Sequence, residues 1–162
     1  MRRGLRAAVL FGLAVAVAGC REASPVYPAE TGCIVQRVAD GDTITVSGCM
    51  ESRVRLLLVD APEVAGGGSE AECYGEEAQA YLRSRLPVGS TVRMERGVLD
   101  RDRYDRALRY VWLGNELLNE TLVQQGFAVR YRDAEDTTFR DRIAAAEAEA
   151  RAAGRGLWNA CP

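Results

Sequence analysis

The stretch RLLLVDAPE (residues 55–63) joins a run of apolar residues to a group of charges. The run from Leu56 to Val59 predicts a strand that is buried on both sides. Arg55 precedes it, and Asp60 and Glu63 follow it around a proline. A core strand has no need of charges at its end, so we infer that it delivers them to a functional site. Strict alternation places Arg55 and Asp60 on opposite faces, so both reach one site only if the strand bends.

The segments around this strand predict a small α+β domain. Upstream, CIVQRVADGDTITVSGC (33–49) is typical of a β-hairpin with a polar turn at its centre. Downstream, periodicity and turn residues predict helices over 73–86, 116–125 and 137–153, the last capped by a threonine, and extended segments over 90–99, 107–113 and 127–131. Five short strands with helices between and after them favour a closed barrel with helices packed on its outside.

The cysteines predict two disulfides in the folded part. Four remain after Cys20, and no CxxC motif is present to suggest a metal or redox site. Pairing the hairpin about Gly41, to within one residue of register, places Cys33 opposite Cys49. Cys73 and Cys161 are then paired by elimination.

The first 20 residues predict export. Arg2, Arg3 and Arg6 precede an apolar segment, 7–18, that is too short to span a bilayer comfortably. The sequence VAGC, ending at Cys20, resembles a bacterial lipobox, with an ordinary signal peptide or a lone membrane anchor as the alternatives. We therefore expect a lipoprotein signal peptide (1–19), a flexible tether (20–32) that starts at lipidated Cys20, and a folded domain (33–162). The expected protein is monomeric and lipid-anchored to the cell envelope, either periplasmic or on the outer surface.

The charge composition restricts the chemistry. The chain has 21 Lys and Arg residues, all of them arginine, 23 acidic residues and no histidine. Three arginines belong to the leader, so the remainder carries 18 arginines against 23 acids, a net charge of −5. This balance argues against coating of nucleic acid by bulk charge, and the missing histidine excludes Ser-His-Asp triads and histidine bases. Carboxylates are the remaining acid-base groups.

Four groups of charges lie where a core does not require them, at Asp40 and Asp42, at Arg55, at Asp60 with Glu63, and at Arg106. Each alone is typical of a turn or a solvated loop. Together they supply oxygen ligands for Ca²⁺, two guanidinium groups for a phosphate and a carboxylate that can deprotonate water. This set suits metal-assisted hydrolysis of a phosphodiester without histidine.

The chain resembles the staphylococcal nuclease family. The matching segments are VADGDTITV, RLLLVDAPE, YGEEAQAYL, DRYDRALRYVW, LLNETLVQQGFA and GLWN, in the family's order and spacing. The resemblance implies a five-stranded OB-fold β-barrel with three α-helices, and a Ca²⁺-dependent enzyme that hydrolyses DNA and RNA with little sequence preference, giving 3′-phosphate ends.

The resemblance also implies a role for individual residues. Asp42, Asp60 and the backbone carbonyl of Ala61 correspond to the Ca²⁺ ligands, with Asp40 behind them. Glu63 corresponds to the general base, and Arg55 and Arg106 bind the scissile phosphate. Arg103, Tyr104 and Tyr131 are candidates for contacts with the nucleic acid.

Two departures from the family pattern bear on substrate binding. Asp105 replaces a turn glycine and places a carboxylate next to Arg106 in sequence, where it is expected to compete with phosphate. The loop VAGGGSEAEC (64–73) is acidic and glycine-rich where a basic loop would hold nucleic acid. The alternative function is therefore a weak or inactive barrel that serves as a surface binding or adhesion module.

Overall fold

Five strands form the closed barrel that the sequence predicts. The computed structural model describes residues 28–66, 68, 70–132 and 135–162, so the predicted signal peptide, Cys20 and much of the tether lie outside the described residues. The barrel strands are β1 (Glu30–Val38), β2 (Thr43–Ser47), β3 (Arg53–Leu56), β5 (Thr91–Arg101) and β6 (Ala107–Leu113). They pair in the order β3-β2-β1-β5-β6, and parallel pairing of β3 with β6 closes the barrel. This confirms the five-stranded OB-fold barrel.

The β1–β2 hairpin has the predicted register close to its turn and a shifted register beyond it. Val38 pairs with Ile44, as pairing about Gly41 requires, but Val35 pairs with Val46, because the register shifts between Val35 and Arg37. Strand β1 starts at Glu30, ahead of the domain boundary predicted at Cys33. The barrel interior is apolar because alternate strand residues face it, among them Val35, Ile44, Val54, Met94 and Val111.

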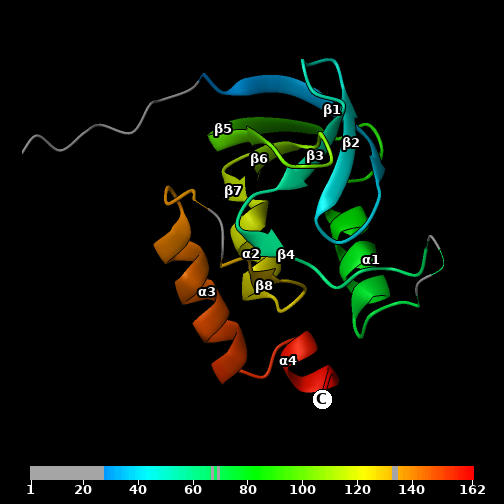
Figure 1. Cartoon of the computed structure of the whole chain (residues 1–162), viewed down its shortest axis with the longest axis vertical. Helices are drawn as coiled ribbons and strands as arrows, with labels where there is room; N and C mark the ends of the chain where they lie inside the picture. Colours follow the sequence, from blue (N-terminus) through cyan, green and yellow to red (C-terminus); the bar gives the residue numbers. More distant parts are fainter. Residues whose placement is uncertain (1–27, 67, 69, 133–134) are drawn as a thin grey trace, which may run out of the picture.

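Three helices accompany the barrel, α1 (Gly75–Arg85), α2 (Leu118–Gln124) and α3 (Arg140–Ala152), and a single-turn helix, α4 (Leu157–Ala160), ends the chain. Figure 1 shows α2, α3 and α4 below the barrel strands, and α2 packs against α3. Two residues predicted as the start of α2 instead form β7 (Glu116–Leu117), which pairs with β6. Among the described residues, no helix has the length and hydropathy needed to cross a membrane.

The predicted threonine cap of α3 is wrong. The residue before the helix, Phe139, makes no capping side-chain hydrogen bond. Instead, the carboxylate of Asp136 accepts a hydrogen bond from the backbone N–H of Thr138 (2.9 Å). Asp136 is 2% exposed and also accepts bonds from the Tyr110 hydroxyl (2.5 Å) and the backbone N–H of Val98 (2.7 Å). One buried carboxylate therefore ties the start of α3 to β5 and β6.

Both predicted disulfides are present. Cys33 is bonded to Cys49, with their Cα atoms 5.2 Å apart, and this bond closes the open end of the β1–β2 hairpin. Cys73 is bonded to Cys161, with their Cα atoms 5.9 Å apart. The second bond joins the segment before α1 to the end of the chain.

Candidate active site

The chain bends between Arg55 and Asp60, which brings these residues to one site. The run from Leu56 to Val59 does not form one continuous strand, because β3 ends at Leu56 and β4 (Val59–Asp60) pairs with β8 (Val129–Arg130) in a separate two-stranded sheet. Leu58 lies at the bend with φ 63°, a left-handed conformation that non-glycine residues adopt at a cost of about 1–2 kcal/mol. Burial of its side chain and a hydrogen bond from the Tyr131 N–H to its carbonyl (2.9 Å) stabilise this conformation.

Arg55 lies between two carboxylates as a result. Its Nη1 donates to Oδ1 of Asp42 (3.0 Å), and its Nη2 donates to Oδ1 of Asp60 (2.5 Å). The Arg55 side chain is 15% exposed, whereas that of Asp60 is 50% exposed. One guanidinium therefore spans from the barrel interior to the solvent-facing end of β4.

Asp42 is a buried carboxylate with several hydrogen-bond donors. Besides Arg55, its oxygens accept bonds from the Thr43 hydroxyl (2.9 Å) and the backbone N–H of Ala61 (3.1 Å). Burial raises the pKa of Asp42 to about 7, although Arg55 acts in the opposite direction. Asp40 adds to the rise and also accepts the N–H of Asp42 (3.0 Å), so it lies behind Asp42 as predicted. Burial disfavours the ionised form of Asp42, so a further positive charge close to its carboxylate would stabilise that form.

Glu63 is an exposed carboxylate on a constrained backbone. Its N–H donates to the Glu72 carboxylate (3.0 Å), and its carbonyl accepts the N–H of Glu72 (2.9 Å). At Gly75, the first residue of α1, a Cβ would lie 2.2 Å from the Glu63 carbonyl oxygen, so only glycine allows this approach. Partial burial and the nearby Asp40 raise the pKa of Glu63, which makes its carboxylate a stronger base.

The β5–β6 turn carries the second candidate arginine. Asp102 accepts hydrogen bonds from the Nε (2.7 Å) and backbone N–H (3.0 Å) of Arg106, and from the N–H of Tyr104 (2.9 Å). Nη1 of Arg106 donates to the Thr43 hydroxyl (3.3 Å), and that hydroxyl donates to Asp42. Hydrogen bonds therefore connect the two candidate arginines through Thr43 and Asp42.

Asp105 is positioned differently from the prediction. Its side chain is 87% exposed and its ion pair is with Arg101 (3.5 Å), while Arg106 pairs with Asp102. The expected competition between Asp105 and phosphate for Arg106 therefore has no support in the structure. Asp105 adopts φ 60° at the turn position, where the family pattern has glycine.

The candidate residues meet in one cleft with a volume of about 600 Å³. Seven of the predicted side chains line it: Arg55, Asp60, Glu63, Arg103, Tyr104, Arg106 and Tyr131. Its walls also include apolar residues, mainly leucines, from β3, the bend and the β5–β6 segment. Asp40, Asp42 and Ala61 are not among the lining residues, and Asp42 reaches the cleft through its contact with Arg55. The structure thus gathers the predicted site, with the most buried carboxylate behind it.

Two aromatic residues give the cleft flat surfaces. Tyr104 is 58% exposed and Tyr131 is 44% exposed. The guanidinium of Arg103 lies over the Tyr104 ring, 4.7 Å from its centroid, and that of Arg106 lies 5.4 Å from it. This arrangement places aromatic rings and positive charge side by side at the wall of the cleft.

Three residues that the sequence reasoning did not select complete the site. They are Thr43, Asp102 and Glu72, which contact Asp42, Arg106 and the Glu63 backbone respectively. Asp102 is four residues before Arg106 in a charged run, which is a detectable pairing signal. No sequence signal marks the contacts of Glu72, because its partner Glu63 lies nine residues earlier in the chain.

The candidate ligands have the oxygen chemistry that a hard cation prefers. Asp42 and Asp60 provide anionic oxygens on either side of the Arg55 guanidinium. A bound cation would add a second positive charge and stabilise the ionised form of the buried Asp42. Within the part of the chain that the structure describes, one trio of Asp, Glu or Cys side chains has ligand atoms close enough for an ion: Glu30, Cys33 and Cys49. Since those two cysteines form a disulfide, this trio is not a competing metal site.

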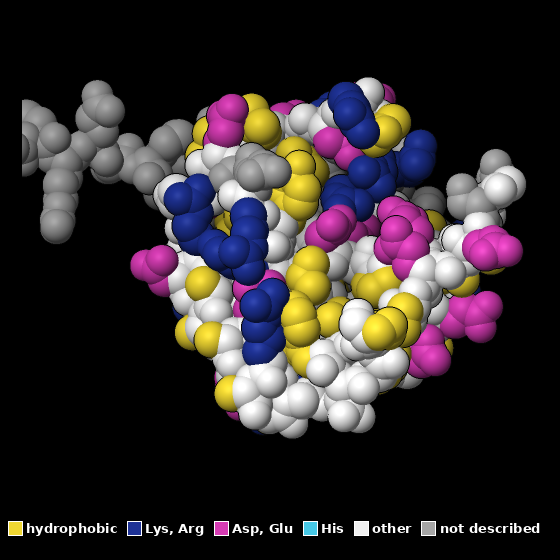
Figure 2. Space-filling model, turned by 60° about the horizontal axis from the view of Figure 1, so that its bottom comes forward, with side chains coloured by type: hydrophobic (Ala, Val, Ile, Leu, Met, Phe, Trp, Pro, Cys, Tyr) yellow, Lys and Arg dark blue, Asp and Glu magenta, His cyan; other side chains and the backbone are white. Residues whose placement is uncertain are grey.

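The surface charge is mixed. On the face drawn in Figure 2, arginine side chains lie on either side of a region where acidic and hydrophobic side chains meet. This distribution agrees with the net charge of −5 for the chain without its leader. Any recognition of phosphate therefore depends on placed arginines such as Arg55 and Arg106.

The fold and the site together define an OB-fold barrel with a charged, aromatic cleft beside it. A family model described as staphylococcal nuclease homologue matches residues 53–160. The thermonucleases of Staphylococcus hyicus and Staphylococcus intermedius are each 34% identical, over 77% and 78% of this chain and 74% and 75% of theirs. Endonuclease YncB of Bacillus subtilis is 34% identical over 77% of this chain and 60% of its own. The chain therefore belongs to the staphylococcal nuclease family, as the resemblance predicted.

Proposed function

We propose that this chain is a Ca²⁺-dependent phosphodiesterase that hydrolyses DNA and RNA with little sequence preference and leaves 3′-phosphate ends. The observation that carries the proposal is the gathering of Arg55, Glu63 and Arg106 in one cleft, with two carboxylates on Arg55. A structural role for the cleft would not explain a base and two guanidinium groups facing the same space. The names of the thermonuclease and endonuclease relatives agree with this activity.

Asp42, Asp60 and the Ala61 carbonyl would hold the calcium ion. When bound, the ion supplies positive charge beside the phosphate and acidifies water. The pairing of Asp42 and Asp60 with Arg55 supports this assignment, because it places both carboxylates around one positive centre.

The side chains of the cleft provide the remaining chemistry. Glu63 takes a proton from a water molecule as that water attacks phosphorus, and its raised pKa suits this role near neutral pH. Arg55 and Arg106 stabilise the negative charge that develops on the phosphate oxygens. The bond from phosphorus to the 5′ oxygen then breaks, and the departing oxygen takes a proton from solvent. The 3′-phosphate end follows from the broken bond.

The lack of sequence preference follows from the walls of the cleft. Tyr131, and the Tyr104 ring together with the planar Arg103 guanidinium over it, offer flat surfaces to bases, and stacking of this kind is tolerant of sequence. Arg103, over the Tyr104 ring, adds positive charge for a neighbouring phosphate. Contacts to backbone and stacked bases suit DNA and RNA alike.

We also propose that the protein is exported as a monomer and anchored by a lipid at Cys20. The leader sequence supports this proposal, and the two disulfides agree with an oxidising compartment. Cys20→Ala is expected to move the protein from the membrane fraction to the soluble fraction. Unchanged membrane association in that variant would contradict lipid anchoring.

The test of the enzymatic proposal is a cleavage assay of the purified full-length chain. Single-stranded DNA and RNA are incubated with calcium or with a chelator, and the product ends are mapped with a 3′-phosphatase. We expect calcium-dependent cleavage and 3′-phosphate ends, with Glu63→Gln purified in parallel to reveal any contaminating nuclease. Binding of DNA without cleavage by the unsubstituted protein would instead support a binding module.

A further inference from the structure

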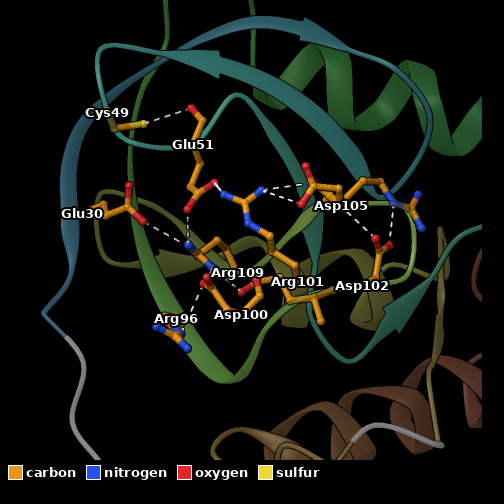
Figure 3. Close-up of polar contacts among 11 residues, drawn as sticks. Glu30, Cys49, Glu51, Arg96, Asp100, Arg101, Asp102, Asp105 and Arg109 are labelled. Atoms are coloured by element: carbon orange, nitrogen blue, oxygen red, sulfur yellow. Dashed lines mark hydrogen bonds and ion pairs between the residues drawn. The ribbon is translucent and has the colours of Figure 1, made fainter.

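An ionic network lies between the disulfide-bonded β2–β3 connection and the β5–β6 turn (Figure 3). At its centre is Arg109, which is 2% exposed. Arg109 contacts the carboxylates of Glu30 (3.2 Å), Glu51 (2.7 Å) and Asp100 (2.9 Å). Because a buried guanidinium requires anionic partners, these contacts fix the Glu51 carboxylate in place.

Glu51 uses its second oxygen for a different arginine. Its Oε2 accepts a hydrogen bond from Nη2 of Arg101 (2.6 Å), and Glu51 itself is only 6% exposed. The same Arg101 guanidinium donates from Nη1 to the backbone carbonyl of Asp105 (3.1 Å). Arg101 therefore connects a buried, immobilised carboxylate to the backbone of the turn.

The turn that Arg101 holds carries residues of the candidate active site. Asp105 has a left-handed backbone conformation, which persists only where its surroundings stabilise it. Tyr104 precedes Asp105 and Arg106 follows it, so the Asp105 carbonyl lies between the two groups proposed to contact nucleic acid. Asp102 contacts both of them from the start of the turn, and Arg101 adds a second anchor.

We propose that Glu51 and Arg101 are positioning residues that hold the β5–β6 turn, and with it Arg106 and Tyr104, in the conformation that binds substrate. The expected changes in KM and kcat rest on the proposed function. The expected change in the conformation of the turn does not depend on it. Arg101 also lines the cleft, so direct contact between Arg101 and phosphate is the competing explanation. The two explanations differ in what they predict for the turn without substrate.

The test compares Arg101→Ala with the unsubstituted full-length chain. Loss of a charge-assisted hydrogen bond predicts that KM for single-stranded DNA rises about three- to tenfold. Because the turn also carries Arg106, which is proposed to stabilise the charge that develops on the phosphate oxygens, kcat should fall as well. Amide hydrogen exchange without substrate should become faster at residues 102–106 and stay unchanged in β1 and β2. Arg101→Lys and Glu51→Gln should give intermediate values of both quantities.

The matched control is Arg142→Ala. Arg142 forms an ion pair with Glu120, and its side chain is 50% exposed, against 40% for Arg101. It lies on α3 and is not among the lining residues of the cleft. Its substitution should leave KM and exchange in the turn unchanged.

Three outcomes would overturn the positioning role. Unchanged KM and unchanged exchange in Arg101→Ala would show that the turn does not depend on this contact. Increased KM with unchanged exchange in the turn would assign Arg101 to direct phosphate binding. If the unsubstituted chain fails to cleave DNA, the proposed function fails, and unchanged exchange in Arg101→Ala would then refute the positioning role separately.

Discussion

Single residues decide whether the charges of this cleft work together. Asp42 is buried and contacts Arg55, Thr43 and Ala61, so it joins β2, β3 and the start of the segment that leads to Glu63. Leu58 has the backbone conformation that brings Asp60 back to Arg55. Both effects depend on one side chain or one dihedral angle, which makes them accessible to point substitution.

Asp42→Asn is expected to remove most of the affinity for calcium while the fold survives. The amide keeps the size of the side chain and removes the charge that a hard cation requires. Since burial raises the pKa of Asp42 to about 7, calcium affinity of the unsubstituted chain should fall as the pH is lowered below about 7. Titration calorimetry with calcium at several pH values measures both effects, and circular dichroism checks the fold. Unchanged calcium binding by the variant would refute this ligand assignment.

Asp136→Asn is expected to lower the stability and change its dependence on pH. Burial acts to raise the pKa of Asp136, but hydrogen bonds from Tyr110, Thr138 and Val98 outweigh it and lower the pKa. Ionised Asp136 therefore stabilises the fold above its unfolded-state pKa of 3.8, and this contribution is lost as the pH falls below that value.

Urea unfolding at pH 7 and at pH 3 measures this effect. The variant should lose about 1–3 kcal/mol at pH 7 and show a smaller loss relative to the unsubstituted chain at pH 3. Asp141→Asn, an exposed position on the first turn of α3, is the control. An equal loss of stability at both pH values would show that ionisation of Asp136 is not the cause.

At the scale of elements, α1 and β4 set the backbone around Glu63. The first residue of α1 packs directly against the Glu63 carbonyl, so the helix and the segment after β4 approach more closely than any side chain at that position would allow. The position of Glu63, the proposed base, therefore depends on α1, although Glu63 is not part of that helix.

Gly75→Ala is expected to lower kcat by about tenfold or more, because the added Cβ must displace the Glu63 backbone from the position needed for proton transfer. The helix itself should persist, since alanine favours it more than glycine does. Steady-state kinetics and circular dichroism measure the two effects. The control is Gly66→Ala in the neighbouring loop, where a Cβ meets no atom within 4 Å. Normal kcat in Gly75→Ala would mean that this approach does not position the base.

At the scale of the whole molecule, the two disulfides constrain the chain over different lengths. The Cys33–Cys49 bond spans 16 residues and the Cys73–Cys161 bond spans 88. The first closes a local hairpin, and the second connects the start of α1 to the end of the chain. Their contributions to stability should differ for this reason.

Replacing each pair by serine is expected to cost about 3 kcal/mol for Cys33 with Cys49 and about 4.6 kcal/mol for Cys73 with Cys161, in the chain-entropy model. Guanidinium unfolding of both double variants gives the two free energies and their order. A larger loss for the hairpin pair would contradict the model. In that case the contacts around Glu51, two residues after Cys49, become the explanation to examine.

Much of the architecture follows from local patterns in the sequence. Alternating apolar residues predict the barrel strands and periods of three and four predict the helices, because burial on one face imposes these periods. The hairpin also fixes Cys33 opposite Cys49 to within one residue. In β6, alternation places Arg109 on the same face as the buried residues Ala107 and Val111, so even this buried arginine had a detectable signal.

Other features depend on contacts between segments that are distant in sequence. A left-handed leucine at position 58 has no local signature, because pairing of Val59 with Arg130 and burial of the side chain stabilise it. A buried aspartate such as Asp136 looks like a solvated one in a polar segment, and only its three donors from β5, β6 and the start of α3 distinguish it. The sequence by itself determined the existence of the five barrel strands and three helices and the types of charged group, because burial patterns are local. Only the tertiary structure decided which arginine meets which carboxylate, because ion pairs form between whichever side chains the barrel brings within about 4 Å of each other.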